Sequence, residues 1–390
     1  LVQNLRAGVF PARWMLQAAY GLGYPAFIFY AALPYYLAAV FKLLGLGYIA
    51  SIKIVQALGF VLAAVAIYGF SRELDRGRVA SLLAALVYSC APFHMVNVYV
   101  RGDSLSEFYA FVFFPLILWA LLHLHRQPGS RNAVWVALAY AGLMLTHNIA
   151  ALLTLWQWLG ILLVIARRAP HRWQRTVQSL AAMGVGALTS AWFWWPALAE
   201  RENVHLEDMT TGYLNYAQHF RGWDLIQPSV LFDYTISSGQ QPFRMGLVQV
   251  VLLIAGLVGL LIRWRRARHV DPQGAFIGLL LFISTLMITP LSRPIWDHIP
   301  LLPMVQFPWR FLSLQALAAS LIVTHLVPEA LRWEWPIALS LGALVILTAL
   351  LGLEPERLWI REEDVTAQRL MLYEYFTANV GGTIRRVELS

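Results

Sequence analysis

Apolar residues dominate this chain in ten runs, each about 17–22 residues long, which is the length that crosses a bilayer as an α-helix. Shorter polar segments separate the runs. The pattern therefore predicts an all-α, polytopic membrane protein with ten spans, at residues 50–70, 79–98, 108–124, 132–147, 149–166, 176–197, 244–262, 273–290, 310–328 and 335–352.

An eleventh apolar run, at 27–46, has a different character. It contains Pro34, Lys42 and three tyrosines. Proline and tyrosine suit a helix that lies along the membrane interface better than one that crosses the hydrocarbon core. We therefore expect 27–46 to form an interfacial helix.

Arginines collect in alternate loops between the predicted spans. By the positive-inside rule these loops are cytoplasmic. The long loops on the opposite face carry most of the carboxylates, which places the working surface outside. The basic loops contain Arg72, Arg76, Arg78, Arg126, Arg131, Arg167, Arg168, Arg172, Arg175, Arg263, Arg265, Arg266, Arg268 and Arg332, and the outer segments are 1–49, 99–107, 198–243, 291–309 and 353–390.

Composition narrows the class of protein further. Only 13% of the residues are charged and 59% are hydrophobic, whereas soluble proteins carry roughly 25% charged residues. A water-soluble enzyme is therefore excluded, and the single cysteine, Cys90, excludes a disulfide scaffold. The net charge of +8 reflects one basic membrane face, so no nucleic-acid partner is expected.

We expect three parts. Residues 1–49 form an outer juxtamembrane loop with the interfacial helix, 50–352 form the transmembrane domain with the outer loop 198–243, and 353–390 form an outer tail. The first residues resemble the middle of a polar loop, and the tail stops without a structural end. These features indicate the body of a longer protein.

The first candidate for chemistry is the segment that begins at Arg101. Asp103 and Glu107 are four residues apart and share one helical face at the outer boundary. Such a pair can bind a divalent cation or take a proton from an acceptor hydroxyl. The structural alternative is a helix start with Asp103 or Ser104 as N-cap and Glu107 completing a capping box.

His147 lies in a very short outer turn between two spans, where a polar group is costly and often functional. A histidine that caps the hairpin is the structural alternative. His94 and His325 complete a set that could ligate haem, although no motif supports it. No zinc-type His or Cys spacing is present.

Two aromatic segments flank the outer face. The segment 192–200 holds four aromatic residues followed by Glu200, and forms an interfacial belt or a surface for stacking sugars. The segment 306–312 holds Trp309 and Arg310 at the outer end of a span. The Arg310 guanidinium can clamp a phosphate, or it can reach out to lipid headgroups.

Several of these segments together resemble the bacterial family of 6-pyruvoyl-tetrahydropterin-synthase-related membrane domains. The resemblance rests on residues 8–14, 20–30, 33–36, 101–115, 146–152, 193–200 and 307–312. Its architecture is similar to the GT-C class of polyprenyl-phosphate-dependent glycosyltransferases. In that class a first outer loop carries juxtamembrane helices and a catalytic acid, and a second outer loop carries another acidic motif.

The resemblance assigns Asp103 and Glu107 to the second acidic position and 27–46 to a juxtamembrane helix. Residues 1–49 contain no Asp or Glu. The resemblance therefore implies that the first acid, and one more span, precede Leu1.

We therefore expect a glycosyltransferase that moves a sugar from a polyprenyl-phosphate donor to an acceptor on the extracytoplasmic face of the bacterial cytoplasmic membrane. Asp103 is the expected position of a divalent cation (Mg²⁺ or Mn²⁺) if the reaction uses one. The alternatives are a transporter or lipid flippase, and a non-catalytic envelope assembly protein. The candidate catalytic residues are Asp103, Glu107 and His147, and the candidate substrate-binding residues are Arg13, Lys53, Arg101, Glu200, Trp309 and Arg310.

Overall fold

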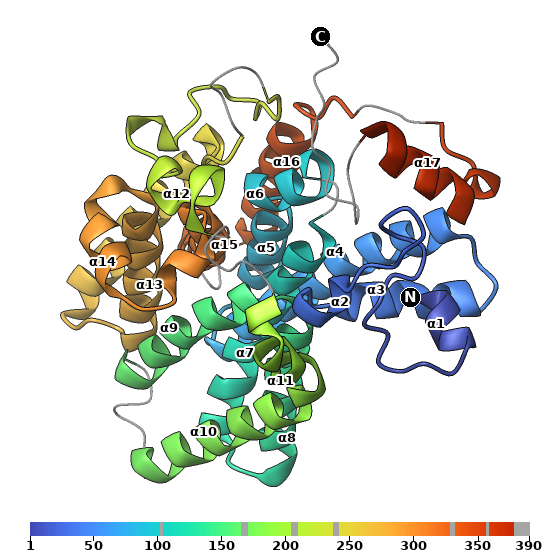
Figure 1. Ribbon diagram of the computed structural model, residues 1–390. Coiled ribbons are helices and arrows are strands. Elements are labelled where there is room, and N and C mark those ends of the chain that lie inside the picture. The colour runs from blue at the N-terminus through green and yellow to red at the C-terminus, as the bar shows by residue number, and fades with distance from the viewer. Residues whose placement is uncertain are drawn as a thin grey trace.

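The computed structural model describes residues 1–101, 104–164, 171–203, 210–236, 242–327, 332–355 and 359–377, and within these ranges the chain is helical, without a named β-strand (Figure 1). The helices are α1 (Val2–Arg6), α2 (Ala26–Phe29), α3 (Leu33–Leu43), α4 (Tyr48–Glu73), α5 (Arg78–Ser89), α6 (Pro92–Met95), α7 (Leu105–Arg126), α8 (Ser130–Thr146), α9 (Asn148–Val164), α10 (Arg172–Thr189), α11 (Ala191–Ala199), α12 (Leu247–Ala267), α13 (Pro272–Ile288), α14 (Arg293–His298), α15 (Leu312–Val323), α16 (Glu334–Leu350) and α17 (Ala367–Thr377).

The ten predicted runs all contain helix, but fewer of them are spans by length and composition. In the described part of the chain α4, α7 and α12 are long and apolar enough to cross a membrane. Two bent pairs raise the number to five. In one pair α5 is followed at 45° by α6 and the π-helix η1 (Val96–Val100), and in the other α13 is followed at 90° by η8 (Pro290–Ser292) and α14. The structure thus supports three to five spans.

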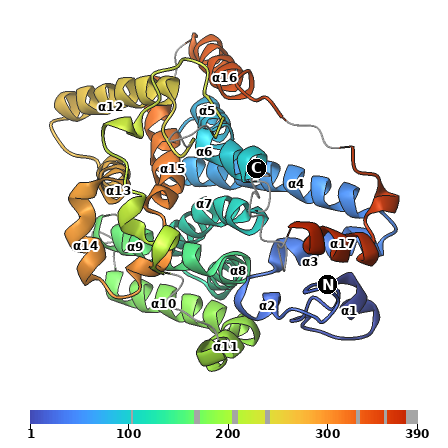
Figure 2. The same ribbon diagram turned by 45° about the horizontal axis from the view of Figure 1, so that its top comes forward.

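Helix α7 lies at the centre of the bundle. Figure 2 shows it surrounded by α4, α8, α9 and α15, all of which pack against it. Its span is 78% buried within the protein, against 28% for α4 and 22% for α12. A helix that is apolar around its whole circumference has no face for water, so burial in a bundle accounts for α7. Helix α15 is also buried along its whole length.

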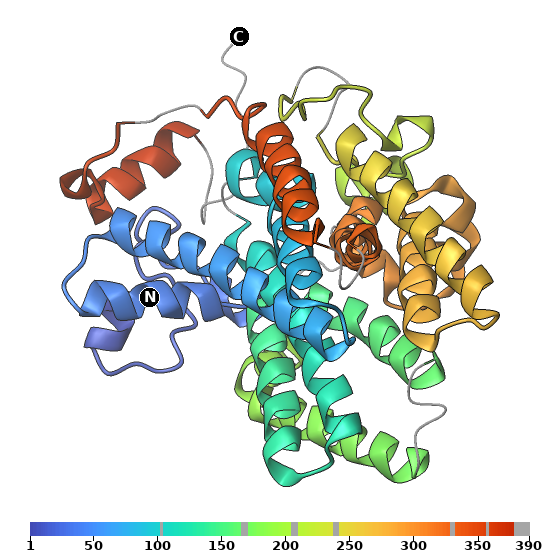
Figure 3. The same ribbon diagram turned by 180° about the vertical axis from the view of Figure 1, so that it is seen from behind.

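Small residues let the helices approach closely. A Cβ atom at Gly186 of α10 would lie 2.5 Å from the carbonyl oxygen of Ala137 in α8, and one at Gly256 of α12 would lie 2.7 Å from that of Ile322 in α15. Without a strong hydrophobic drive inside lipid, such close backbone packing is a main source of helix association. On the far side of the bundle α16 packs across α5 (Figure 3).

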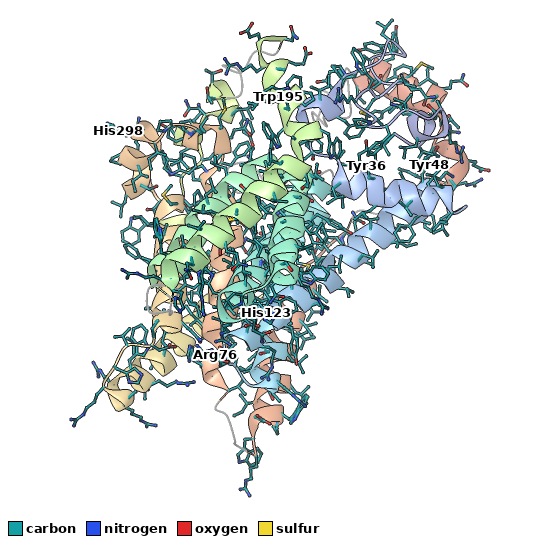
Figure 4. The ribbon with its side chains drawn as sticks, turned by 90° about the horizontal axis from the view of Figure 1, so that it is seen from below. Tyr36, Tyr48, Arg76, His123, Trp195 and His298 are labelled. Carbon is teal, nitrogen blue, oxygen red and sulfur yellow. The ribbon has the colours of Figure 1, made fainter. Side chains whose placement is uncertain are left out.

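The arginine-rich loops meet at one end of the bundle. Arg126 donates to Asp75, with N–O distances of 2.6 and 3.0 Å, and Arg76 lies 3.9 Å from Asp271. The hydrogen bonds from Arg126 lower the pKa of the Asp75 carboxyl below its usual range. Figure 4 shows Arg76 at this end and Trp195 at the opposite end. The structure therefore brings three of the predicted basic loops together at one end of the bundle.

The predicted outer loop and tail both lie against the opposite end. In the outer loop, the Tyr234 hydroxyl donates to the carbonyl of Ala349 at 2.8 Å. In the tail, the Glu362 carboxylate accepts N–H bonds from the first turn of α4, and Glu374 of α17 accepts one from Tyr20 at 2.8 Å. A carboxylate at a helix N-terminus satisfies donors that have no partner within the helix. The tail therefore packs on the first loop, as Figure 1 shows for α17.

The sorting of the loops predicts their accessibility. Cysteines introduced at Arg172 and Arg266, in a Cys90→Ala background, should be shielded from an impermeant thiol reagent in intact cells. Cysteines at Glu200 and Gln218 should react, because these exposed positions lie at the opposite end. Labelling in intact cells and after permeabilisation measures this. Reaction of the first pair in intact cells would reverse the orientation.

The glycine contact between α8 and α10 predicts a stability difference. Gly186→Ala should lower the unfolding free energy by about 1–3 kcal/mol, since the new methyl group meets a backbone carbonyl that cannot move aside easily. Gly184→Ala is the matched control, because a Cβ there meets nothing within 4 Å. Thermal unfolding of the purified protein in detergent compares the two. Equal midpoints would show that α8 and α10 are not in close contact.

Candidate functional site

A buried carboxylate, Glu107 in the first turn of α7, is held between two arginines. It is 6% exposed. Its Oε2 atom lies 2.8 Å from Nη1 of Arg101 and 3.4 Å from Nε of Arg310, and His147 Nε2 lies 3.9 Å away. A charge is removed from water at such a position only when opposite charges compensate for the lost hydration. We call Arg101, Glu107, His147 and Arg310 the ion cluster.

The π-helix η1 positions Arg101, which directly follows it. Asn97 of η1 accepts a hydrogen bond from Nη1 of Arg101 at 2.7 Å and itself donates to the carbonyl of Phe93 at 2.8 Å. Single turns of π-helix recur at functional sites because the extra residue re-aims the side chains. The guanidinium of Arg101 also lies 5.0 Å from the ring centre of Trp309.

A tight turn positions Arg310. The N–H of Phe307 donates to the carbonyl of Val305 at 2.7 Å, and Gln306 between them has φ +63° and ψ −48°. This is a γ-turn of the strained kind, which the surrounding structure has to hold in place. The Val305 carbonyl also accepts a bond from Nη1 of Arg310 at 2.7 Å, and Gln306 lies 3.4 Å from the same atom. The strained turn therefore aims two acceptors at one guanidinium.

Three stacked rings form a wall of the site. The Trp309 ring lies between Phe307, at 4.7 Å and 18°, and Phe243, at 4.0 Å and 7°. Trp309 is 3% exposed. Because Phe243 ends the outer loop, this loop contributes to the wall. The rings lower the local dielectric, which strengthens the attraction within the ion cluster.

His147 joins the cluster from the turn between α8 and α9. Its Nδ1 accepts the N–H of Ala150 at 3.1 Å, so the hairpin-capping interpretation is confirmed. A neutral ring with Nδ1 as acceptor carries its proton on Nε2, the atom that faces Glu107. The capping bond thus also orients His147 toward the carboxylate.

Ligand access is limited on one side of the cluster. A cavity lined by Glu107, His147, Arg310 and Ser313 has a volume of about 10 Å³, which is room for about one water molecule. The side chain of Arg101 is 19% exposed, whereas that of Arg310 is 10% exposed. Arg101 is therefore the member of the cluster most open to an approaching ligand.

The structure brings together five of the nine residues predicted from the sequence: Arg101, Glu107, His147, Trp309 and Arg310. It leaves three apart. Arg13 donates to the carbonyl of Trp192 at 3.3 Å, Lys53 is exposed on α4, and Glu200 is exposed after α11. Asp103 lies outside the described residues.

The structure corrects two structural alternatives from the sequence. Ser104 occupies the N-cap position of α7, as that alternative predicts, but it makes no side-chain capping bond and Glu107 is paired with Arg101, so these two residues form no capping box. Asp103, the other predicted N-cap, lies outside the described residues. Arg310 does not reach out to lipid headgroups, since it is 8% exposed and paired with Glu107.

Sequence reasoning missed three residues of the site: Asn97, Gln306 and Phe243. Asn97 and Gln306 each precede one of the two arginines by four residues, which is the spacing that places side chains side by side on one helical face. That spacing was a usable signal for Asn97. Nothing local pointed to Phe243, because it reaches Trp309 only through the path of the outer loop.

The described residues hold no group of three or more His, Cys, Asp or Glu side chains arranged for a metal ion. His94, His147 and His325, which the sequence suggested as haem ligands, do not form such a group. The expected Mg²⁺ or Mn²⁺ site at Asp103 lies outside the described residues.

Comparison with known proteins finds a match to a family described as the 6-pyruvoyl-tetrahydropterin synthase related domain, a membrane protein, over residues 27–355. The match includes the whole ion cluster. An uncharacterized protein of Lactococcus lactis subsp. cremoris (strain MG1363) is 23% identical over 243 residues, which is 55% of this chain and 39% of that relative. The chain thus matches about two fifths of the length of this relative.

The ion cluster predicts a strong stability effect. Glu107→Gln should lower the unfolding free energy by about 3–5 kcal/mol, because it leaves the buried Arg310 and the partly buried Arg101 without a counter-charge. Glu363→Gln is the matched control, since its exposed pair with Arg361 contributes little. Thermal unfolding in detergent measures both variants. A Glu107→Gln variant as stable as the control would show that the carboxylate is not buried between the arginines.

Proposed function

Since the chain belongs to the family of 6-pyruvoyl-tetrahydropterin synthase related membrane proteins, we propose that it is a GT-C-like glycosyltransferase. It transfers a sugar from a polyprenyl-phosphate donor to an acceptor hydroxyl at the extracytoplasmic face of the bacterial cytoplasmic membrane. The observation that carries the proposal is the ion cluster, which holds more positive than negative charge in a buried place.

The excess charge points to an anionic ligand. Arg101 and Arg310 carry two positive charges and Glu107 carries one negative charge. Among the described residues neither arginine pairs with a second carboxylate. A buried uncompensated charge is costly, so a bound anion stabilises the site. The hydrogen bonds that the two arginines donate to described residues all come from Nη1. The Nη2 atom of each arginine can therefore donate to a phosphate.

The negative charge of a lipid phosphate increases when the sugar is transferred, and two arginines stabilise this increase. The bond between the anomeric carbon of the sugar and the phosphate oxygen breaks, and a bond between this carbon and the acceptor oxygen forms. The departing phosphate changes from a diester with one negative charge to a monoester with up to two. Two positioned guanidinium groups stabilise this developing charge more than they stabilise the donor, and such a difference accelerates the reaction.

The acceptor proton needs a base other than Glu107. The Glu107 carboxylate is committed to the two arginines, so its role is to hold them at a fixed separation and orientation. Asp103, two positions after Arg101 in the chain, is the base that we propose from the sequence. His147 orients Glu107 from the opposite side. The exposed rings of Trp192 and Trp195 offer surfaces for stacking a sugar.

Substitution of Asp103 tests the chemical step. In the complete purified protein Asp103→Asn should abolish transfer from a polyprenyl-phosphate sugar while leaving thermal stability unchanged, because an amide does not take the acceptor proton. Glu363→Gln in the exposed tail is the control with normal turnover. Product formation across a panel of donor sugars is measured. Normal turnover by Asp103→Asn would remove this base from the mechanism.

Substitution of Arg310 tests phosphate binding. Arg310→Lys keeps the charge but loses the two-pronged hydrogen bond, so the affinity for polyprenyl phosphate should fall about tenfold or more. Arg361→Lys, on the exposed tail, should bind as the wild type does. Unchanged affinity in Arg310→Lys would contradict the phosphate site. If the wild-type protein binds polyprenyl phosphate but forms no glycan product, the flippase alternative is favoured.

A further inference from the structure

A large cavity lies at the opposite end of the bundle from the ion cluster. Its volume is about 790 Å³, which is within the range of about 300–1,000 Å³ that small-molecule sites occupy. Helices α7 and α8 line it, and Glu73 at the end of α4 closes one side. His123, one of its lining residues, lies near Arg76 at the arginine-rich end in Figure 4. We call this cavity the α7–α8 groove.

Two glycines seat the rings that shape the groove. A Cβ atom at Gly69 of α4 would lie 2.4 Å from the Trp119 ring, and one at Gly142 of α8 would lie 2.3 Å from the Phe113 ring. Both rings therefore lie directly against the backbone of a neighbouring helix. Because the glycines have no side chain, the rings occupy the space next to the helix backbone, and the space beside the rings stays open.

The lining changes from apolar to polar along the groove. Phe113, Leu116, Trp119 and Leu138 line the part of the groove nearer the middle of the bundle. Polar residues that include His123 line the part at the arginine-rich end, which we call the mouth. Ten helical residues separate Phe113 from His123, or about 15 Å along the α7 axis. That length is about half of the hydrocarbon core of a bilayer. The apolar part of the groove thus has the depth of one leaflet.

The groove opens toward lipid rather than toward the protein interior. Trp135 and Leu138 of α8, which line it, are both 56% exposed. On an apolar helix of a membrane protein such residues face acyl chains. A lipid can therefore enter sideways from its own leaflet, without crossing a polar barrier.

The mouth offers a positive charge to a headgroup. The Glu73 carboxylate is compensated, since it lies 3.1 Å from His123 and 3.7 Å from Arg126. Arg131 at the mouth is exposed, and it forms no ion pair with the described residues. The surrounding loop end is also rich in arginine. This end therefore complements an anionic headgroup, which each basic side chain near a membrane surface attracts by about 1 kcal/mol.

We propose that the α7–α8 groove is a binding site for an anionic phospholipid of the leaflet that borders the arginine-rich end. One acyl chain lies along Trp119 and Leu138, and the headgroup phosphate meets Arg131. The site lies at the other end of the bundle from the ion cluster and does not depend on the proposed transfer reaction.

Competition between two lipids tests this site. The purified protein is exchanged against vesicles with equal amounts of phosphatidylglycerol and phosphatidylcholine, and the lipids that it retains are counted by native mass spectrometry. We expect phosphatidylglycerol to be retained about fivefold over phosphatidylcholine, the ratio that one basic side chain supplies. Equal retention of the two lipids by the wild type would overturn the proposal.

Variants locate the bound lipid. Ala120→Trp fills the groove from α7 and should remove retention of both lipids, whereas Arg131→Glu should remove only the preference. The matched controls are Ala255→Trp and Arg265→Glu on exposed faces of α12, which should behave as the wild type does. Wild-type retention by Ala120→Trp, or loss of the preference in Arg265→Glu, would contradict a site in the groove.

Two further measurements guard against a misfolded variant. Leu138→Trp fills the groove from the exposed side of α8, where a larger ring is easily accommodated, and it should also remove retention. A photoreactive phosphatidylglycerol should crosslink to peptides of α7 and α8 in the wild type. Crosslinks confined to α12 or to the outer loops would place the lipid elsewhere and overturn the proposal.

Discussion

The pairing of Glu107 with two arginines is the interaction on which the outer end of this protein depends. A buried carboxylate requires positive partners, and these come from segments far apart in the chain: the π-helix that precedes α7 and the strained turn that precedes α15. Each partner is fixed in turn by its own acceptors, Asn97 for Arg101 and the Val305 carbonyl for Arg310. The ion pairs to Glu107 therefore help to hold the π-helix and the γ-turn in their conformations, and these two backbone features in turn position the arginines around Glu107.

The need of polar groups for hydrogen-bond partners also explains how the outer loop and the tail pack on the bundle. Helix ends leave backbone donors and acceptors without partners, and in this protein distant segments supply them. The tail carboxylate of Glu362 satisfies the start of α4, and the outer loop reaches the end of α16 through Tyr234. The outer loop also contributes Phe243 to the wall beside Trp309, so in this loop one segment both contacts the end of α16 and borders the ion cluster.

The two ends of the bundle carry the two proposed lipid sites, and these differ in their chemistry. At the end that holds the ion cluster, two arginines share one carboxylate, and the ligand that we propose there is one whose negative charge grows during a reaction. At the arginine-rich end, Arg131 lies beside an apolar groove that is open to the membrane, which favours a lipid that stays bound. The centre of α7 connects them as a buried apolar column. In this protein both proposed binding sites therefore lie at the polar boundaries of the bundle rather than in its apolar core.

The sequence by itself determined the helical membrane character, the segregation of basic and acidic loops, and the residue types at the outer boundary, because these follow from local hydropathy and from the cost of charge in lipid. It was sufficient to select Arg101, Glu107, His147, Trp309 and Arg310 one by one. Only the tertiary structure decided that they form one cluster, that Arg13, Lys53 and Glu200 stand apart, and that α5 and α13 continue into bent segments rather than end. The physical reason is that contacts between Glu107 and Arg310 depend on how α7 packs against the start of α15, and such packing is set by side-chain shape over the whole bundle, which no local pattern encodes.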